Sequence, residues 1–581
     1  MISYRKLAMR VLGHSPVSAV KTARRSTGKR AAALALTAAL VVGMTLPAFA
    51  DTWYIDDGDI SISAGENGNN VTQNGETTED TDTVIKSNGS SSNTVTIHAD
   101  EGKTVNVTLD NVTINVDEGY QHGYDPNAYK TAVSVTGSGN TNIELNGNNT
   151  LTSGYGHAGL EHNKTDDSGT LTITDDKGAA GSLTANGGYG AAGIGGSDKQ
   201  DGQVTITGGE ITANGGSQGA GSGGAGIGGG AGNKQAVGGD GDVTISGGTI
   251  NATGGNQAAG IGGGAYGNGT VTITDGDITA KATGDYGAGI GGGAGAIQKG
   301  TLIGGNGTVT ISGGTITEAS GGYMAAGIGS GYQGLGTVTI EGDAVIKNAQ
   351  GGEAGAGIGS GTYGDSEIII RGDAVIENAE SSGNGAGIGS GQGDLYPDGD
   401  GMVIDPTVGN VTIEGNAKIE NAKSGYGGSG IGGGTIGIGN VIIRGNAQIG
   451  NATGGEEGAG IGGGALGTGD VSIEGNVTIE NAQGGAGAAG IGGGAETEPD
   501  TEDTRNKVSI KSTEAGSPDI TATGGGASDG SLPGAAAIGS GSVADGATEV
   551  KSDITVEGKV TINATGGGDV AIGDSINGET Q

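Results

Sequence analysis

The stretch VTISGGTINATGGNQAAGIGGG, residues 243–264, decides the fold of this 581-residue chain. It holds three short segments, 243–245, 249–251 and 259–262, in which branched residues alternate with polar or small ones. This alternation is typical of β-strands. Glycine pairs separate the segments, and glycine readily adopts the positive φ that sharp corners need. The stretch therefore predicts one coil of three short strands and three corners.

The Gly-Ile-Gly motif at the end of this stretch recurs along the chain. Its base spacing is 30 residues, longer intervals indicate inserted loops, and Leu160 fits the series one step earlier. A fixed period of this length indicates stacked units, and parallel β-connections are almost always right-handed. We therefore predict an all-β fold, a right-handed, single-stranded parallel β-helix (solenoid). The motif isoleucines are Ile194, Ile227, Ile261, Ile290, Ile328, Ile358, Ile388, Ile431, Ile461, Ile491, Ile538 and Ile572.

The composition limits how such a fold is stabilised. Glycine supplies 136 of the 581 residues, which without a period would be typical of a disordered chain. There is no Cys, one Trp and one Phe, so disulfides, cysteine metal sites and a large aromatic core are excluded. We expect stacked rows of Val, Ile and Ala inside the coils instead. The predicted valine row is Val204, Val243, Val271, Val309, Val338 and Val411.

Two polar columns predict the register of the coils. In the first, each Asn follows an Ile by two residues, and stacked amides can hydrogen-bond from coil to coil. In the second, the charge alternates between neighbouring coils, as favourable cross-strand pairs do. The columns are Asn348, Asn378, Asn421, Asn451 and Asn481, and Glu341, Arg371, Glu414, Arg444 and Glu474.

An outward column of threonines is also expected. Regular threonines on a flat face suit ice or crystalline glycan, but β-propensity on a solvent-facing side explains them as well. Ile369 and Ile442 interrupt the column, which argues against ice. The column is Thr205, Thr244, Thr272, Thr310, Thr339 and Thr412.

The N-terminus has the pattern of a secretory signal over residues 1–50. A basic stretch, an apolar run at 31–46 and Ala48-Phe49-Ala50 have the order of a cleavable leader. The apolar run is shorter than the ~20 residues that span a bilayer, so we expect cleavage and no membrane insertion afterwards. We interpret 51–180 as divergent first coils with a cap, and 181–581 as regular repeats. Since the repeat still runs at Ile572, the pattern is typical of a truncated chain.

The charge of the chain restricts its partners. The net charge is −37, although residues 1–50 carry eight bases and no acid. An acidic body repels nucleic acid and anionic membranes, and we expect neither as a partner. Acidic or polar insertions near 394–406 and 496–506 predict surface loops. Loose Ca²⁺ binding by acidic loops is the one metal interaction expected, and no cofactor is expected.

The repeats lack a constellation typical of catalysis. Arg occurs in them only at Arg371, Arg444 and Arg505, and the charge column accounts for the first two. Hydrolysis would need two convergent carboxylates, whereas the acids occupy repeat positions or loops. The sequence 238–242 misplaces an Asp of the Ca²⁺-binding nonapeptide. We therefore expect no catalytic residue and no specific metal site.

Two further groups have simple interpretations. His122, His157 and His162 lie near Glu161 and Asp125, but a metal site needs three or four of them to converge, and we interpret them as surface polar residues. The tripeptide at 371–373, Arg-Gly-Asp, is typical of integrin recognition. One coil earlier the same position reads Glu-Gly-Asp, which indicates a repeat variant.

Eight tyrosines are the candidate ligand-binding residues. Each lies four or five residues from a motif residue, which places them on the corners that flank one face. An aromatic ring with a polar tip suits stacking on a sugar ring. The alternative is that the rings only cover glycine-rich corners. The candidates are Tyr155, Tyr189, Tyr266, Tyr286, Tyr323, Tyr332, Tyr363 and Tyr426.

The segments LTANGG (183–188) and AGIGG (192–196), with their echoes up to Ile572, carry a family resemblance. Over nearly all of 51–581 the chain resembles Gly-rich secreted β-helix proteins of Gram-positive anaerobic bacteria, often described as carbohydrate-binding or adhesin-like. The resemblance implies a secreted or cell-surface location, with polysaccharide or host glycan as partner. We expect a noncatalytic solenoid for adhesion or binding of extended carbohydrate. The alternatives are a passive stalk for another domain and a polysaccharide lyase or hydrolase.

Overall fold

The computed structural model describes residues 51–117, 129–178, 180–217, 221–232, 237–298, 300–398, 401–496, 505–528, 532–543 and 550–575. These residues belong to one compact unit, 50–581. The predicted secretory signal lies outside the described residues. Among the residues that are described, no helix has the length and apolar character needed to cross a membrane.

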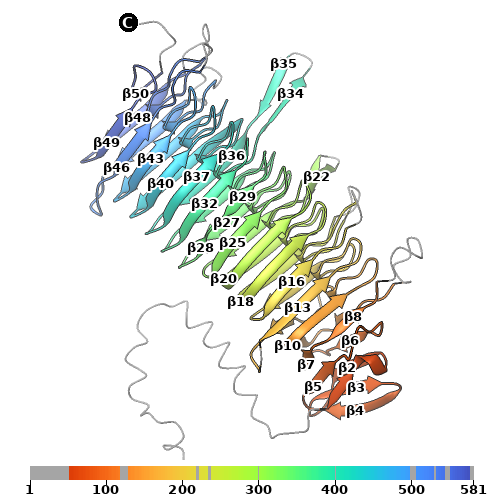
Figure 1. The fold of residues 1–581 in the computed structure, drawn as a ribbon. Helices are drawn as coiled ribbons and strands as arrows, with labels where there is room; N and C mark the ends of the chain where they lie inside the picture. Colours follow the sequence, from red (N-terminus) through yellow and green to blue (C-terminus); the bar gives the residue numbers. More distant parts are fainter. Residues whose placement is uncertain are drawn as a thin grey trace, which may run out of the picture. The chain divides into compact units, whose positions relative to one another are not determined.

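The repeating unit is a coil of three strands, each paired in parallel with its counterpart in the next coil (Figure 1). In one coil the strands are β15 (Gly202–Ile206), β16 (Glu210–Asn214) and β17 (Ile227–Gly228). β18 (Gly241–Gly254) pairs with both β15 and β16, and β19 (Ile261–Gly262) pairs with β17. The predicted parallel β-helix is confirmed, and each residue type meets its equivalent one coil later.

The strands form three rows along the coils. The first row contains β7 (Thr104–Asp110), β10 (Asn140–Thr152), β12 (Leu171–Thr174), β15, β18, β20 (Gly269–Ala282), β24 (Gly307–Ile311), β27 (Gly336–Ile340), β31 (Ser366–Ile370), β36 (Thr407–Ile413), β39 (Gly437–Gly445), β42 (Gly469–Gly475), β45 (Asn506–Lys511) and β48 (Ser552–Glu557). The second row contains β8 (Thr113–Asn115), the later halves of β10, β18 and β20, and β13 (Gly181–Asn186), β16, β25 (Thr315–Ser320), β28 (Val345–Ile346), β29 (Ala349–Gly351), β32 (Val375–Ser381), β37 (Lys418–Ser424), β40 (Gln448–Thr453), β43 (Thr478–Gln483), β46 (Asp519–Thr523) and β49 (Thr561–Thr565).

The third row carries the motif isoleucines. It contains β6 (Val95–His98), β9 (Val133–Thr136), β11 (Leu160–His162), β14 (Ile194–Gly195), β17, β19, β21 (Ile290–Gly291), β26 (Ile328–Gly329), β30 (Ile358–Gly359), β33 (Ile388–Gly389), β38 (Ile431–Gly432), β41 (Ile461–Gly462), β44 (Ile491–Gly492), β47 (Ile538–Gly539) and β50 (Ile572–Gly573). Leu160 pairs with Ile194, as predicted. The row also runs further back, through Val133 and Val95, which lack flanking glycines.

One continuous apolar core fills the coils. The motif isoleucines from Ile194 to Ile538 are fully buried, and the predicted valine row is at most 2% exposed. Small Ala residues complete the layers, so the walls approach closely without large aromatic side chains. In the last described coil the same positions are more exposed, with Ile572 at 46%.

The first part of the solenoid contains antiparallel strands. β2 (Ile60–Ala64), β3 (Asn69–Gln73) and β4 (Glu76–Asp80) form a meander, and β2 also pairs in parallel with β6. β1 (Thr52–Tyr54), the short helix η1 (Ile55–Asp57) and β5 (Thr83–Lys86) complete this part. Trp53 donates a hydrogen bond from Nε1 to Asp80 at 2.8 Å. The division of the chain at residue 180 stays a prediction.

The predicted polar columns form ladders. The amides of Asn421, Asn451 and Asn481 each donate to the Asn one coil earlier, over 3.1 to 3.4 Å. Asn348 does not extend this chain of amides, because Asn378 donates to the carbonyl of Lys347. A second amide ladder was not predicted, and it runs from Asp373 through Asn416 and Asn446 to Asn476.

The charge column and the threonine column also lie in register. Arg371 and Arg444 each contact the Glu of the preceding coil at 2.6 Å, and Lys511 with Glu557 continues the alternation. The threonines stack outward on the first row and are half-buried. Ile369 and Ile442 occupy the same column, as predicted.

The predicted surface loops are wrong in part. The insertion near 394–406 forms a β-hairpin, β34 (Asp394–Asp398) with β35 (Gly401–Asp405), that extends away from the stacked strands (Figure 1). A shorter hairpin joins β22 (Gly295–Gln298) and β23 (Thr301–Gly304). In the second insertion Asn506 is fully buried, because it begins β45 and accepts a hydrogen bond from the backbone N–H of Gly469.

Candidate functional site

The segments before and after each third-row strand meet on one surface. The backbone N–H four residues after a motif Ile donates to the carbonyl four residues before the Ile of the preceding coil. Tyr332 N–H donates to Tyr286 O at 2.9 Å, and Thr362 N–H donates to Met324 O at 2.9 Å. Tyrosines from both flanks of the motif therefore come together, which their sequence spacing alone did not show.

A left-handed backbone position marks this surface. The fifth residue after the motif Ile has φ between 56° and 64° in seven coils, and none of these residues is glycine. For a residue with a side chain this conformation costs about 1–2 kcal/mol. The residues are Lys199, Tyr266, Gln333, Tyr363, Ile436, Leu466 and Glu496.

Three of the predicted tyrosines form a column across three successive coils, which we name the tyrosine corner: Tyr286, Tyr332 and Tyr363. The ring centroids of Tyr286 and Tyr332 are 5.2 Å apart, and those of Tyr332 and Tyr363 are 5.7 Å apart. Tyr363 is 37% exposed. Its phenol hydrogen-bonds to Asp394, and burial together with the charge of Asp394 raises the pKa of Tyr363.

Two of the predicted tyrosines do not present an exposed ring. Tyr266 is 4% exposed, because it packs with Ala231, Ala265 and Ala294 in a small satellite core. Tyr155 is 9% exposed, because it is sandwiched between Tyr129 and Tyr189 at centroid distances of 5.3 and 4.8 Å. For Tyr266 and Tyr155, the alternative that the rings only cover glycine-rich corners describes the structure better than an exposed sugar-binding ring does.

Three predicted tyrosines remain, and none has a described ring contact with the tyrosine corner. Tyr189 is half-buried and stacks on Tyr155. Tyr323 and Tyr426 both precede a motif Ile by five residues and are 46% and 53% exposed. The phenol of Tyr323 hydrogen-bonds to Glu353, and this bond raises its pKa. Neither ring is in a described aromatic pair, and each offers an open face.

Two hairpins flank the tyrosine corner along the third row. β21, β26, β30 and β33 follow one another in register. The hairpin β22–β23 follows β21, Tyr332 follows β26, Tyr363 follows β30, and the hairpin β34–β35 follows β33. Large exposed apolar side chains gather in these segments after third-row strands: Ile297, Leu335, Tyr363, Leu395 and Tyr396.

Tyr396 was missed by the sequence spacing. It is 44% exposed and lies on β34, inside the insertion that breaks the repeat. An exposed large apolar side chain next to others marks an interaction surface more often than a single one does. The hairpin register, which the sequence did not reveal, puts Tyr396 two residues beyond Asp394 on the same face of β34.

The interpretation of the histidine group as surface residues is wrong for part of it: His157 is half-buried, and two other members are buried. Glu161 and His162 are 7% and 2% exposed on β11. His157 Nδ1 contacts Glu161 Oε2 at 2.8 Å. His122 and Asp125 lie outside the described residues. Within the part of the chain that the structure describes, no group of three His, Asp or Glu is arranged to hold a metal ion.

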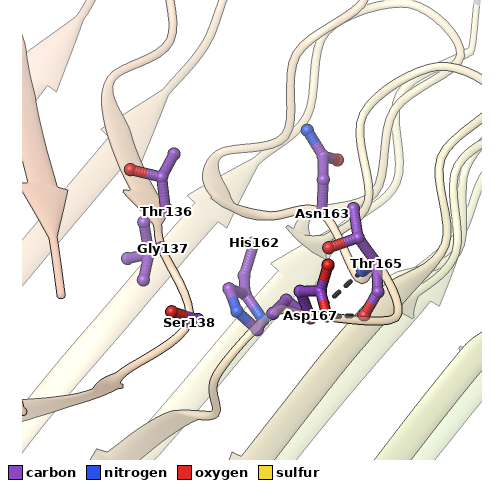
Figure 2. Close-up of a pocket in the computed structure, with 9 residues that line it drawn as sticks. Thr136, Gly137, Ser138, His162, Asn163, Thr165 and Asp167 are labelled. Atoms are coloured by element: carbon purple, nitrogen blue, oxygen red, sulfur yellow. Dashed lines mark hydrogen bonds between the residues drawn. The ribbon is translucent and has the colours of Figure 1, made fainter. Parts of the chain in front are cut away.

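His162 lines a pocket of about 350 Å³. Figure 2 shows Thr136, Gly137 and Ser138 on one side of His162, with Asn163, Thr165 and Asp167 on the other. Nδ1 of His162 donates to the carbonyl of Gln203 at 2.8 Å. Burial lowers the pKa of His162, against backbone hydrogen bonds with Gln203 and Gly169 that raise it. The ring therefore ties neighbouring coils together.

The Arg-Gly-Asp tripeptide is part of two ladders, the charge column and the second amide ladder. Arg371 pairs with Glu341, and Asp373 accepts a hydrogen bond from the amide of Asn416 at 2.9 Å. Gly372 has a φ of +78° at the turn between them. Both charged side chains are engaged with neighbouring coils, which agrees with the interpretation as a repeat variant.

Comparison with known proteins agrees with the fold. Residues 243–265, 271–294 and 309–332 match the family model of a beta helix repeat. The chain is a parallel β-helix repeat protein. Neither the curated proteins nor the solved structures gave a significant match. Tyr286 lies in the second matched segment and Tyr332 ends the third, whereas Tyr266 directly follows the first.

Proposed function

We propose that this β-helix is a secreted, noncatalytic protein that binds extended carbohydrate through the tyrosine corner, in adhesion at a bacterial surface. The secretory pattern of residues 1–50 and the resemblance to Gly-rich proteins of Gram-positive anaerobes support the location. Because fold alone does not determine function, the geometry of the corner has to carry the binding part of the proposal.

The observation that carries the proposal is the column of rings. Coils repeat at about 4.8 Å, and the three tyrosines follow that repeat with centroid distances of 5.2 and 5.7 Å. Rings at regular intervals suit a polymer of sugar rings, each with an apolar face and hydroxyl edges. Several weak contacts on one chain add up to a useful affinity.

The left-handed backbone at Tyr363 adds to this argument. Residues in such conformations cluster where a structure has a function to perform. Glycine, the most abundant residue of this chain, would adopt φ of 62° without strain. Tyr266 has the same conformation with a buried ring, so it is the 37% exposure of Tyr363 at this position that favours a role for its ring outside the coil.

The test is binding to glycan arrays and insoluble polysaccharides by the chain and two variants. Tyr332→Ala combined with Tyr363→Ala should weaken binding about tenfold or more, since each lost ring contact contributes about 0.5–1.5 kcal/mol. Tyr54→Ala removes a ring of similar exposure, 36%, far along the chain from the corner and should bind like the original protein.

Three results would contradict the proposal. Absence of glycan binding by the original protein would favour the passive stalk. Equal binding by both variants would remove the corner from the site. Release of unsaturated or reducing sugars from the polysaccharide would establish a lyase or hydrolase in its place.

A further inference from the structure

The hairpin β34–β35 presents a defined face next to the tyrosine corner. Its antiparallel register sets Asp394 opposite Asp405 and Tyr396 opposite Val403. Successive side chains on a strand point to opposite faces, and directly opposite residues share a face. Asp394, Tyr396 and Val403 therefore lie on one face, and Leu395 lies on the other.

The contact between Asp394 and Tyr363 orients this face. The backbone N–H of Tyr363 donates to the carbonyl of Gln392 at 2.8 Å, two residues before Asp394, so the base of the hairpin lies against the corner. Asp394 also acts on the phenol of Tyr363 and raises its pKa, after the larger effect of burial, so the face that bears Asp394 and Tyr396 is the one turned toward the corner. The pKa of Tyr332 is raised by burial first, then by Tyr363 and Tyr286, and last by the charge of Asp394. The aromatic surface of the corner thus continues through a carboxylate onto the hairpin, where Tyr396 is 44% exposed.

A carboxylate between aromatic rings suits neutral sugars better than anionic ones. An ionised carboxylate only accepts hydrogen bonds, so it suits the hydroxyl donors of a sugar. Asp405 stands opposite Asp394 and adds a second negative charge on the same face. A uronic acid or sulfated sugar would bring a like charge to this place, which is unfavourable.

We propose that Asp394 and Tyr396 extend the binding site of the tyrosine corner and select neutral over anionic glycan chains. This inference rests on the proposed function and names the ligand class of the same site. The ring of Tyr396 stacks on one sugar unit while Tyr363 and Tyr332 hold others. Asp394 accepts from the hydroxyl groups between them.

The experiment measures affinity for neutral cello- and xylo-oligosaccharides and for oligogalacturonate by calorimetry. The original protein should bind at least one neutral series at least tenfold more tightly than oligogalacturonate. Tyr396→Ala should weaken neutral binding about tenfold, in the range of one lost aromatic contact. Leu395→Ala is the matched control, since Leu395 is 43% exposed on the opposite face of the same strand. Asp394→Asn should reduce the difference in affinity between neutral oligosaccharides and oligogalacturonate.

The outcomes separate this inference from the proposed function. If Tyr363→Ala abolishes binding while Tyr396→Ala behaves like Leu395→Ala, the hairpin is not part of the site and only this inference fails. If the original protein binds oligogalacturonate as tightly as neutral chains, the selectivity fails. If it binds no carbohydrate at all, both proposals fail.

Discussion

The guanidinium of Arg444 lies 2.6 Å from the carboxylate of Glu414 in the preceding coil, and Arg371 lies 2.6 Å from Glu341 in the same way. Each Arg thus bridges two successive coils of the first row. Since Glu474 follows Arg444 in register, no two like charges in this series are direct neighbours. The ladder fixes the register of the coils from outside, as the isoleucines do from inside.

Reversing one charge of this ladder should destabilise the protein. Arg371→Glu would put like charges side by side, and we expect a loss of about 0.5–1 kcal/mol in the free energy of unfolding. Glu341→Arg combined with Arg371→Glu should restore part of it, because the pair is re-formed but the new glutamate at position 371 still neighbours Glu414 in the next coil. Urea unfolding of the two single variants and the double variant measures the coupling. Additive losses without restoration would show that the pair does not interact.

A glycine of the third row should tolerate no side chain. Gly359 has a φ of +138°, and a Cβ there would overlap the carbonyl oxygen of Gly389 in the next coil. Gly359→Ala should cost about 3 kcal/mol or more, from strain and overpacking. Gly89→Ala is the control, because no atom lies within 4 Å of its added Cβ. Similar unfolding midpoints for both variants would argue against coils packed this closely.

Stability should fall as the pH decreases below 6.5 because of His162. Its pKa is lowered from 6.5 in the folded protein, so between the two values the unfolded chain binds more protons. Its contribution is therefore complete above 6.5 and is lost toward acid pH. His162→Gln should show a smaller difference between unfolding midpoints at pH 7.5 and 5.5. The ring of His98 is half exposed, so His98→Gln should show the same difference in unfolding midpoint as the original protein. An equal pH dependence of the midpoint in all three proteins would show that His162 is not responsible.

The parts of this structure that repeat were predictable from the sequence. Ile358, Val338 and Arg371 lie at the coil period from equivalent or complementary residues. Because the coils stack in register, residues one period apart are in contact. The same reasoning failed where the chemistry of a position varies from coil to coil. The fifth residue after the motif Ile is Lys199 in one coil and Tyr363 in another, so the residue type at this position does not predict the left-handed backbone.

Insertions and local packing explain the other differences. Tyr396 lies in an insertion whose hairpin register cannot be derived from the 30-residue period. Tyr266 and Tyr155 have the expected spacing but are buried, because small Ala residues and neighbouring rings close around them. His162 resembled a surface residue in sequence, yet the third row continues through β11 and carries it into the interior.

The most direct test of the account is a paired measurement on Tyr363→Gly. Glycine relieves the left-handed strain at φ of 62° while the ring is lost, so the two effects on folding oppose each other. We predict an unfolding free energy within about 1 kcal/mol of the original, because the lost ring contact is worth about as much as the relieved strain, and a marked loss of affinity for neutral glycan. A clearly destabilised variant that still binds glycan like the original protein would show that Tyr363 only covers the corner, and would contradict the account.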